Sequence, residues 1–326
     1  MLLVYYLIFV NIAAFALYGI DKHKAVKGRW RIPERTLIFI AVIGGSAGAL
    51  AGMLIWHHKT RKKKFYITVP VFTVLLAASV CFCLYQNYHL TVSEYEADIG
   101  LGHEIRIVQI SDLHNQFFGF GQHVLLDRIR ELKPDIIAVT GDVVDSRHTS
   151  YAIAQDFLEG AADIAPVYYI TGNHEARLTG ERFGRFLEDI KSAGVILLDD
   201  TYIDCGDYIL AGVADSSCFN FSFNFSAYGR FDGTKPVIML SHDPYFKDLY
   251  QSLGADLVLT GHIHGGQIII PGKGGLLSPD FTFFPEYYGG IYDAGGMRMI
   301  VSRGLGNSVL PVRINDYPEI VSITVK

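Results

Sequence analysis

The chain has 326 residues, half of them hydrophobic and 19% charged, with a formal net charge of −5. This composition excludes a disordered or collagen-like protein, and the length fits two domains. The charge is unevenly divided, because residues 1–90 hold 11 Lys and Arg against 2 Asp and Glu, whereas residues 91–326 hold 17 against 31. The acidic second part argues against nucleic-acid binding, which requires a basic face.

Residues 1–90 contain three uncharged apolar runs, at residues 1–20, 37–56 and 67–86. Each run is long enough to cross the hydrocarbon core of a bilayer as a helix. A cleaved signal peptide is the alternative for the first run, but that run has no basic segment before it and exceeds the usual apolar length of a signal. We therefore predict an all-α membrane domain of two to three spans at residues 1–90, which makes this a multi-pass protein of the cell membrane.

Two basic segments separate the runs, with six Lys and Arg in residues 21–36 and five in residues 57–64. Three complete spans would place these segments on opposite sides of the membrane, against the preference of Lys and Arg for the cytoplasm. Either the middle run, which contains Gly44-Gly45-Ser46-Ala47-Gly48, re-enters without crossing, or one basic segment lies on the disfavoured side.

The charges around the third run predict the side of the second domain. Five Lys and Arg precede the run, and residues 91–106 follow it with four acidic residues and one Arg. By the positive-inside tendency, residues 91–326 should lie outside the cytoplasm.

The first domain also resembles a small bacterial membrane-domain family of unassigned function, over about residues 5–70. The matching segments are Tyr18-Gly19-Ile20-Asp21-Lys22, Trp30-Arg31-Ile32-Pro33-Glu34 and His58-Lys59-Thr60-Arg61-Lys62. This resemblance implies no chemistry, and we interpret the domain as an anchor with charged residues at the membrane interface.

From residue 104 onward, short β-rich apolar runs alternate with helical stretches, a pattern typical of an α/β domain. Polar motifs follow five of these runs. In chain order they are Ser111-Asp112-Leu113-His114, Gly141-Asp142, Gly172-Asn173-His174-Glu175, Ser241-His242-Asp243 and Gly261-His262-Ile263-His264. Sites in such sheets form at the carboxyl ends of the strands, so we expect these motifs to converge.

The side chains in these motifs are typical metal ligands. Asp, Asn and His offer oxygen and nitrogen atoms suited to Mn, Fe or Zn, and no Cys joins the set. The carboxylate of Asp142 could bridge two ions about 3.5–4 Å apart. Each motif is weak alone, but the five in this order predict a site for two divalent metal ions.

At these motifs the sequence resembles the calcineurin-like metallophosphoesterases, over about residues 103–326. The resemblance implies a four-layer α-β-β-α sandwich in which two mixed sheets face each other between outer helices. It also implies two metal ions and a catalytic histidine, His174. The first ion would be held by Asp112, His114, Asp142 and His264, and the second by Asp142, Asn173, His242 and His262.

Later segments are similar to a membrane-associated bacterial branch of this family. They are His264-Gly265-Gly266-Gln267, Tyr288-Gly289-Gly290-Ile291-Tyr292, Ser302-Arg303-Gly304-Leu305-Gly306 and Pro311-Val312-Arg313. Some members of the branch hydrolyse the pyrophosphate of UDP-diacylglucosamine in lipid A synthesis, and others have only model phosphodiesterase activity. The resemblance therefore implies a reaction class and leaves the substrate open.

We hypothesise a membrane-anchored phosphohydrolase that cleaves a phosphodiester or pyrophosphate bond in a lipid-linked substrate. The attacking group would be a hydroxide that bridges the two metals. His174, oriented by a carboxylate, would protonate or stabilise the departing oxygen, and Asp142 would contribute to both metal sites. The expected partners are the bilayer and this substrate.

Two other functions remain as alternatives. One is a phosphomonoesterase for nucleotides or phosphoproteins, which would need neither an anchor nor an apolar surface. The other is a scaffold without metals, against which every ligand position argues.

Two aromatic tracts flank the site motifs. The first is Phe219, Phe221, Phe223 and Phe225, and the second is Phe281, Phe283, Phe284, Tyr287 and Tyr288. Strict alternation is typical of a strand with one face in the core. The alternative is an apolar lip that meets the bilayer or an acyl chain.

Two further pairs of residues stay open on sequence alone. Arg303 and Arg313 could contact phosphate or pair with surface carboxylates. Cys205 and Cys218 could form a disulfide if the compartment is oxidising.

Overall fold

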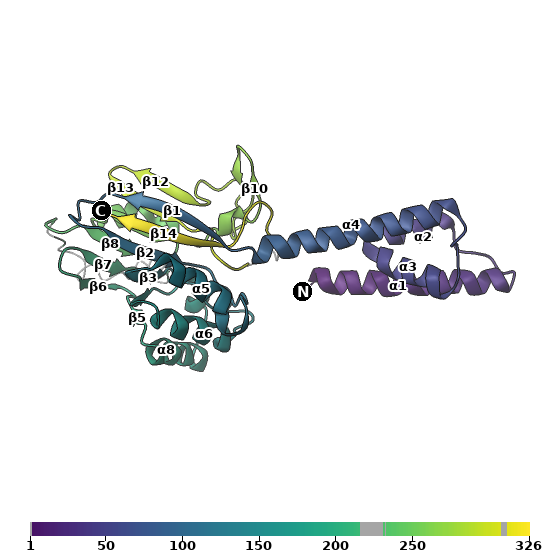
Figure 1. Ribbon diagram of the computed structural model, residues 1–326, viewed down its shortest axis with the longest axis horizontal. Coiled ribbons are helices and arrows are strands. Elements are labelled where there is room, and N and C mark those ends of the chain that lie inside the picture. Colours follow the sequence, from purple (N-terminus) through teal and green to yellow (C-terminus); the bar gives the residue numbers. More distant parts are fainter. Residues whose placement is uncertain (1, 216–230, 232, 308–311) are drawn as a thin grey trace. The chain divides into compact units, whose positions relative to one another are not determined.

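The computed structural model describes residues 2–215, 231, 233–307 and 312–326. The chain forms two compact units, unit 1 (Met1–Leu84) and unit 2 (Tyr85–Lys326), and helix α4 (Lys63–Tyr88) contains the boundary between them (Figure 1). Cys218 and the first aromatic tract lie outside the described residues.

Unit 1 is helical, and its middle segment is bent. Between α1 (Leu2–Val26) and α4 lie α2 (Glu34–Ile40), a π-helical turn η1 (Ala41–Gly45) and α3 (Ser46–Ile55). The helical geometry breaks at Ile43 and Gly44, and Gly44 has φ 113°, which side-chain-bearing residues rarely adopt. Two described stretches, Glu34–Ile55 and Lys63–Tyr88, are apolar and long enough to cross a membrane.

The bent segment goes partway along α1 and returns. At its start the Ile32 N–H donates to Asp21 Oδ1 (2.9 Å), and just after its end His58 Nε2 lies 2.7 Å from Asp21 Oδ2. At the bend, Asn11 Nδ2 donates to the Gly44 carbonyl (2.8 Å). Asn11 and Asp21 are ten residues apart on one helix, which corresponds to about 15 Å. The segment α2–η1–α3 is therefore a helical hairpin whose depth is about half the thickness of a hydrocarbon core.

Close contact between small residues holds this hairpin against α1. A Cβ at Gly48 would lie 2.0 Å from the backbone oxygen of Asn11, so only glycine fits there. The core of unit 1 is a cluster that includes Ala14, Tyr18, Leu37 and Ala49. Large apolar side chains such as Phe9 (72% exposed) remain on the outside.

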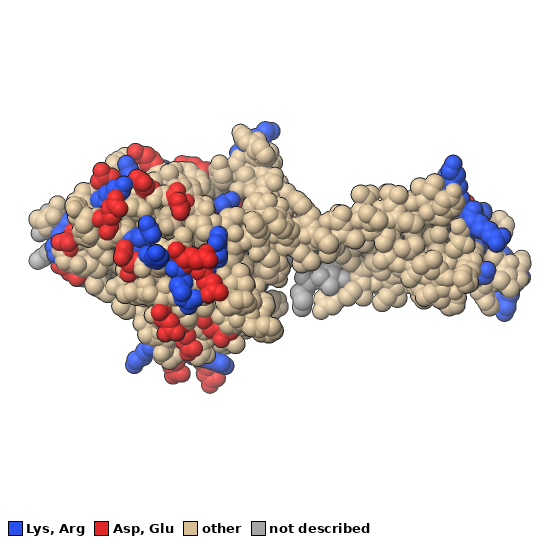
Figure 2. Space-filling model, in the orientation of Figure 1, with Lys and Arg blue, Asp and Glu red and all other residues tan. Residues whose placement is uncertain are grey.

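The charges of unit 1 gather at one end. The Lys and Arg residues lie where α1 ends and α4 begins, and the visible surface along the helices carries no charge (Figure 2). Because both ends of the hairpin meet Asp21, the two basic segments lie at the same end of the unit. An apolar outer surface bounded by a charged end is typical of a membrane-embedded helical domain.

Unit 2 is built on two six-stranded mixed sheets and one short pair. The first sheet has the order β1 (Thr91–Ala97), β14 (Glu319–Val325), β2 (Ile105–Ile110), β3 (Ile136–Val139), β4 (Val167–Tyr169), β5 (Ile196–Leu197). The second has the order β12 (Gly290–Ala294), β13 (Met297–Val301), β9 (Leu257–Thr260), β8 (Val237–Leu240), β7 (Ile209–Gly212), β6 (Thr201–Asp204). The short pair is β10 (Ile269–Ile270) with β11 (Gly274–Gly275).

Helices cover the outer face of the first sheet (Figure 1), and a short helix packs on the second sheet through Tyr250. The longer ones are α5 (His123–Leu132), α6 (Tyr151–Ala162) and α8 (Glu181–Ser192), which pack on the first sheet. The short ones are η2 (Phe120–Gln122), α7 (Asn173–Ala176), η3 (Pro244–Phe246), α10 (Lys247–Ser252) and η4 (His264–Gly266). In α5, Leu125, Leu126 and Ile129 are buried at helical spacing, which explains why this face packs inward.

The two sheets pack face to face. One core cluster joins Ile107 and Ile323 of the first sheet to Leu240, Leu259 and Ile300 of the second. The expected α/β sandwich with two mixed sheets is therefore confirmed. Strands β2, β3 and β4 run parallel, as do β7, β8 and β9, so the carboxyl ends of each group open onto a shared edge.

Candidate metal centre and active site

The five polar motifs converge at the carboxyl ends of β2, β3, β4, β8 and β9. Several of their residues have left-handed backbone conformations, which are uncommon without glycine and concentrate at functional sites. These residues are Asp112 (φ 53°), His114 (φ 44°), Asp142 (φ 54°), His262 (φ 71°) and His264 (φ 51°). Their side chains leave the strand ends sharply and are buried.

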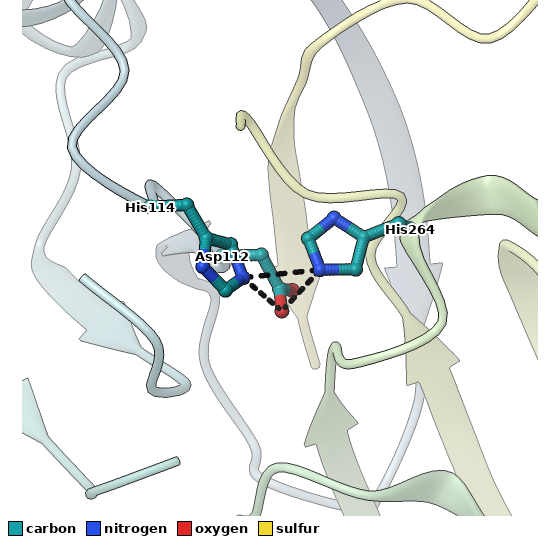
Figure 3. Close-up of side chains that lie close together, drawn as sticks. All are labelled: Asp112, His114 and His264. Atoms are coloured by element: carbon teal, nitrogen blue, oxygen red, sulfur yellow. Dashed lines mark hydrogen bonds and ion pairs between the residues drawn. The ribbon is translucent and has the colours of Figure 1, made fainter. Parts of the chain in front are cut away.

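Three of these side chains form a first cluster, shown in Figure 3. His114 Nε2 lies 3.1 Å from His264 Nε2, and His264 Nε2 lies 3.5 Å from Asp112 Oδ1. Two nitrogens bound to one tetrahedral ion at about 2.0–2.1 Å would lie about 3.3 Å apart. The spacing of the first cluster therefore suits a shared cation.

Asp142 lies between this cluster and a second one. Its Oδ2 is 3.4 Å from His114 Nε2 and 3.3 Å from His242 Nε2. His242 Nε2 in turn lies 3.1 Å from His262 Nδ1. One ligand atom from each of Asp142, His242 and His262 lies within 4.8 Å of the other two, and these three residues form the second cluster. Asp142 thus contacts both sets, as a bridging carboxylate would.

Hydrogen bonds outside the clusters orient three of the histidines. His242 Nδ1 donates to the Thr140 carbonyl (2.8 Å), and His264 Nδ1 donates to the Gly306 carbonyl (3.2 Å). His262 Nε2 donates to Asp280 Oδ2 (3.3 Å). Each bond occupies the outward nitrogen of its ring and leaves the other nitrogen facing the cluster, which is the usual arrangement of metal-binding histidines.

Two further observations fit a pair of cations. Asn173 Oδ1 is a buried acceptor that no hydrogen-bond donor reaches within the described parts of the chain. Burial lowers the pKa of His114 to about 3 and holds the pKa of His264 well below its usual value, so both imidazoles are neutral. A neutral imidazole and an unsatisfied amide oxygen are what a divalent ion requires of its ligands. The residues present therefore fit two divalent ions.

Glu175 organises the loops that carry the ligands, a role that the sequence did not reveal. Its fully buried carboxylate accepts from the backbone N–H groups of Asp142 (2.8 Å), Gly172 (2.9 Å) and Val144 (3.1 Å). Burial raises the pKa of Glu175 to about 8, whereas these three donors favour its ionised form. Glu175 thus ties the end of β3 to the end of β4.

His174 lies beside the clusters, and its orientation differs from the prediction. Its Nδ1 accepts from the Ser146 backbone N–H (3.0 Å), while the nearest carboxylate, Asp145, is 3.7 Å from that nitrogen. A backbone donor, rather than a carboxylate, therefore makes the hydrogen bond at Nδ1. Burial lowers the pKa of His174, so its neutral form carries the proton on Nε2.

A cavity of about 150 Å³ opens beside these residues. Its lining includes Asp142, Asn173, His174, His262 and His264, joined by Arg147, Arg177, Pro279 and Asp280. Sequence reasoning missed the two arginines because neither belongs to a recognisable motif. Arg147 pairs with Asp145 (2.9 Å), and Arg177 is exposed at the cavity. Both place positive charge where a phosphate would enter.

Arg303 and Arg313 have structural roles. Arg303 pairs with Glu319 (2.8 Å), and the fully buried Arg313 pairs with Asp316 (3.2 Å). Of the two alternatives left open by the sequence, both arginines pair with carboxylates, but these carboxylates are buried and do not lie on the surface. Arg313 also donates to the Gly306 carbonyl (2.6 Å), which is the acceptor that orients His264.

The second aromatic tract follows the cavity-lining Pro279 and Asp280 directly in sequence. Phe281, Phe283 and Phe284 are 65%, 68% and 49% exposed, while Tyr287 is buried. Phe281 and Phe284 have positive φ angles (62° and 51°). Three exposed phenylalanines in four residues form an apolar patch that follows the cavity lining in sequence, whereas the tyrosines after them pack inward.

Each of the two units matches a family model of known proteins. A family model described as calcineurin-like phosphoesterase matches residues 105–266, and one described as a protein of unknown function, DUF1294, matches residues 11–65. An uncharacterized metallophosphoesterase of Aquifex aeolicus is 28% identical over 74% of this chain and 94% of its own length. The phosphodiesterase YaeI of Escherichia coli is 28% identical over 67% of this chain and 81% of its own length. The uncharacterized protein YsdA of Bacillus subtilis is 39% identical over 24% of this chain and 86% of its own length.

Proposed function

The chain belongs to the calcineurin-like phosphoesterases and is a metal-dependent phosphoester hydrolase, and from this premise we propose that it cleaves a phosphodiester or pyrophosphate bond in a lipid-linked substrate. The observation that carries the reaction class is the pair of ligand clusters that meet at Asp142. Two divalent ions bound there would activate a water molecule and neutralise charge on the phosphoryl oxygens.

The protein groups around the clusters bind and orient the substrate. Arg147 and Arg177 line the cavity and attract the phosphate anion. Asp145 holds Arg147 in place through a bidentate pair (Nε 3.2 Å and Nη2 2.9 Å). Among the described residues that line the cavity, Asp142 and Asp280 are acidic, and Asp142 belongs to the ligand clusters. The substrate phosphate would therefore meet the positive charge of Arg147 and Arg177.

We assign His174 to the departing oxygen as a hydrogen-bond donor. Since Nδ1 accepts from Ser146, Nε2 carries the only ring proton and can donate it to a developing oxyanion. A neutral imidazole is a poor full acid, so stabilisation rather than complete proton transfer is the role that this geometry supports.

The exposed patch of Phe281, Phe283 and Phe284 supports a substrate with an apolar part. A small soluble nucleotide would gain nothing from three exposed phenylalanines next in sequence to the cavity lining, whereas an acyl chain would bury them. The similarity to a phosphodiesterase supports a phosphodiester as the bond that is cleaved.

We also propose how unit 1 lies in the membrane. Helices α1 and α4 would cross, and the hairpin α2–η1–α3 would re-enter, which gives two spans. Both basic segments then lie on one side, which removes the conflict that three spans would create. With these segments in the cytoplasm, unit 2 lies outside it.

Turnover by the full chain in detergent with Mn²⁺ tests the reaction class. The substrates are a chromogenic diester, the matching monoester and a nucleoside-diphosphate lipid, each with wild type, Asp142→Asn and the matched control Asp248→Asn. We expect turnover of the diester or the pyrophosphate lipid, lost by at least about 100-fold in Asp142→Asn because both metal sites weaken. Preference for the monoester would overturn the substrate class, and metal-independent turnover would overturn the dimetal site.

A further inference from the structure

The charged end of unit 1 contains a buried polar network that anchoring alone does not require. Asp21 has no exposed surface and accepts from Arg31 Nη2 (2.9 Å) and from the Ile32 N–H (2.9 Å). His58 Nε2 lies 2.7 Å from the same carboxylate. One buried carboxylate thus joins the end of α1 to both basic segments.

A second carboxylate extends the network. Glu34 accepts from Lys59 Nζ (2.8 Å) and from Lys62 Nζ (2.5 Å), and the side chain of Lys59 is only 3% exposed. His57 and Lys59 have positive φ angles (44° and 62°), so the turn that carries them is held in an uncommon conformation. Interior groups therefore fix this loop in one shape.

The network frames a cavity of about 690 Å³. Its lining includes five cationic side chains, namely Lys22, Arg31, Lys59, Arg61 and Lys62, and two histidines, His57 and His58. Asp21 and Glu34 compensate only part of this charge. Among the described residues, neither Lys22 nor Arg61 has an acidic group within ion-pair distance. The cavity therefore presents uncompensated positive charge on a fixed frame.

Tryptophans mark the same end of the unit. The chain has two, and Trp30 (92% exposed) and Trp56 (40% exposed) lie in or beside the two basic segments. Tryptophan is enriched where the hydrocarbon core meets the lipid headgroups. The cavity thus has the size, charge and surroundings to take an anionic headgroup.

We propose that this cavity is a binding site for a phosphate group, presented either by an anionic phospholipid or by a soluble phosphate compound. Arg31 and Arg61 supply planar hydrogen-bond donors that match phosphate oxygens, and Lys22 adds a point charge. The site lies within unit 1 and does not depend on the chemistry of unit 2.

Lipid binding to the full chain in neutral detergent tests the proposal. The probes are phosphatidylglycerol, phosphatidylcholine and inorganic phosphate, measured through the shift in thermal unfolding midpoint at constant ionic strength. The variant is Lys22→Gln with Arg61→Gln, and the matched control is Lys27→Gln with Lys64→Gln, which removes two exposed charges of the same segments that do not line the cavity. Circular dichroism confirms that each variant folds.

We expect saturable binding of phosphatidylglycerol that weakens about 10- to 30-fold in the cavity variant and less than about threefold in the control. Binding of phosphatidylglycerol but not of inorganic phosphate would identify a lipid ligand. Binding of inorganic phosphate that is weakened in the cavity variant but not in the control would identify a soluble ligand. The site would be overturned if phosphatidylglycerol binding weakened equally in both double variants. It would also be overturned if phosphatidylcholine and phosphatidylglycerol bound with equal affinity and inorganic phosphate had no effect.

Discussion

At the scale of single residues, Glu175 shows how the site depends on a side chain that is not itself among the clustered ligands. Its two oxygens accept three backbone N–H groups from the ends of β3 and β4. A carboxylate can serve all three donors, whereas an amide offers one acceptor oxygen and turns an NH₂ group toward the rest. The backbone of Asp142 therefore relies on the two acceptor oxygens of Glu175.

Glu175→Gln should accordingly lower the affinity for Mn²⁺ by about 10- to 100-fold and the free energy of unfolding by about 2–3 kcal/mol. Metal titration followed by activity, together with the thermal unfolding midpoint, measures both effects. Glu188→Gln, an exposed change of the same chemistry on α8, is the control. Unchanged metal affinity in Glu175→Gln would show that the loops hold their shape without this carboxylate.

Asp199 predicts a pH dependence of stability. Burial raises its pKa to about 6, although Thr171 donates to it from both its N–H (2.8 Å) and its Oγ1 (2.7 Å). The pKa of an Asp in the unfolded chain is about 3.9. Between about pH 4 and pH 6 the folded protein therefore holds a proton on Asp199 that the unfolded chain has released. Stability contributed by this group is therefore highest below about pH 4 and declines as the pH rises through about 6.

Asp199→Asn should remove this decline. Relative to wild type, the variant should gain about 1–2 kcal/mol between pH 4 and pH 7, less than the full pKa displacement implies because the side chain is partly exposed. Asn can still accept from the Thr171 N–H. Thermal unfolding of both proteins across this range is the measurement, and parallel curves would show that Asp199 is ionised normally.

At the scale of elements, the sequence predicted the strands and their polar ends well because each signal is local. A β-rich run followed by Asp, Asn or His is visible without knowledge of the fold. The hydrogen bond from Ser146 to His174 and the network of Arg313 were not visible, since they join segments whose proximity depends on packing. Residues 37–56 illustrate the same limit: hydropathy reports that a run is apolar, whereas the bend at Gly44 and the return along α1 arise from contacts with Asn11 and Asp21.

At the scale of the whole molecule, the hairpin geometry makes a prediction about topology. If α1 and α4 cross and α2–η1–α3 re-enters, the loops on either side of the hairpin share one side of the membrane, and unit 2 lies on the other. In a variant with the four native cysteines replaced, Lys27→Cys and Arg61→Cys should react with an impermeant maleimide only in inside-out vesicles. Asp293→Cys in unit 2 should react only in right-side-out vesicles.

The three labelling positions test two predictions independently: that α2–η1–α3 re-enters, and that unit 2 lies outside the cytoplasm. Opposite sides for Lys27→Cys and Arg61→Cys would mean that residues 37–56 cross, which the hydrogen bonds of Asp21 to both loops contradict. Both loops exposed in right-side-out vesicles, with Asp293→Cys protected, would preserve the hairpin and reverse the membrane side. In the expected arrangement, the basic cavity faces the cytoplasmic leaflet, where anionic headgroups concentrate. The metal centre then acts outside the cytoplasm, so substrate and cavity ligand are drawn from different sides of one membrane.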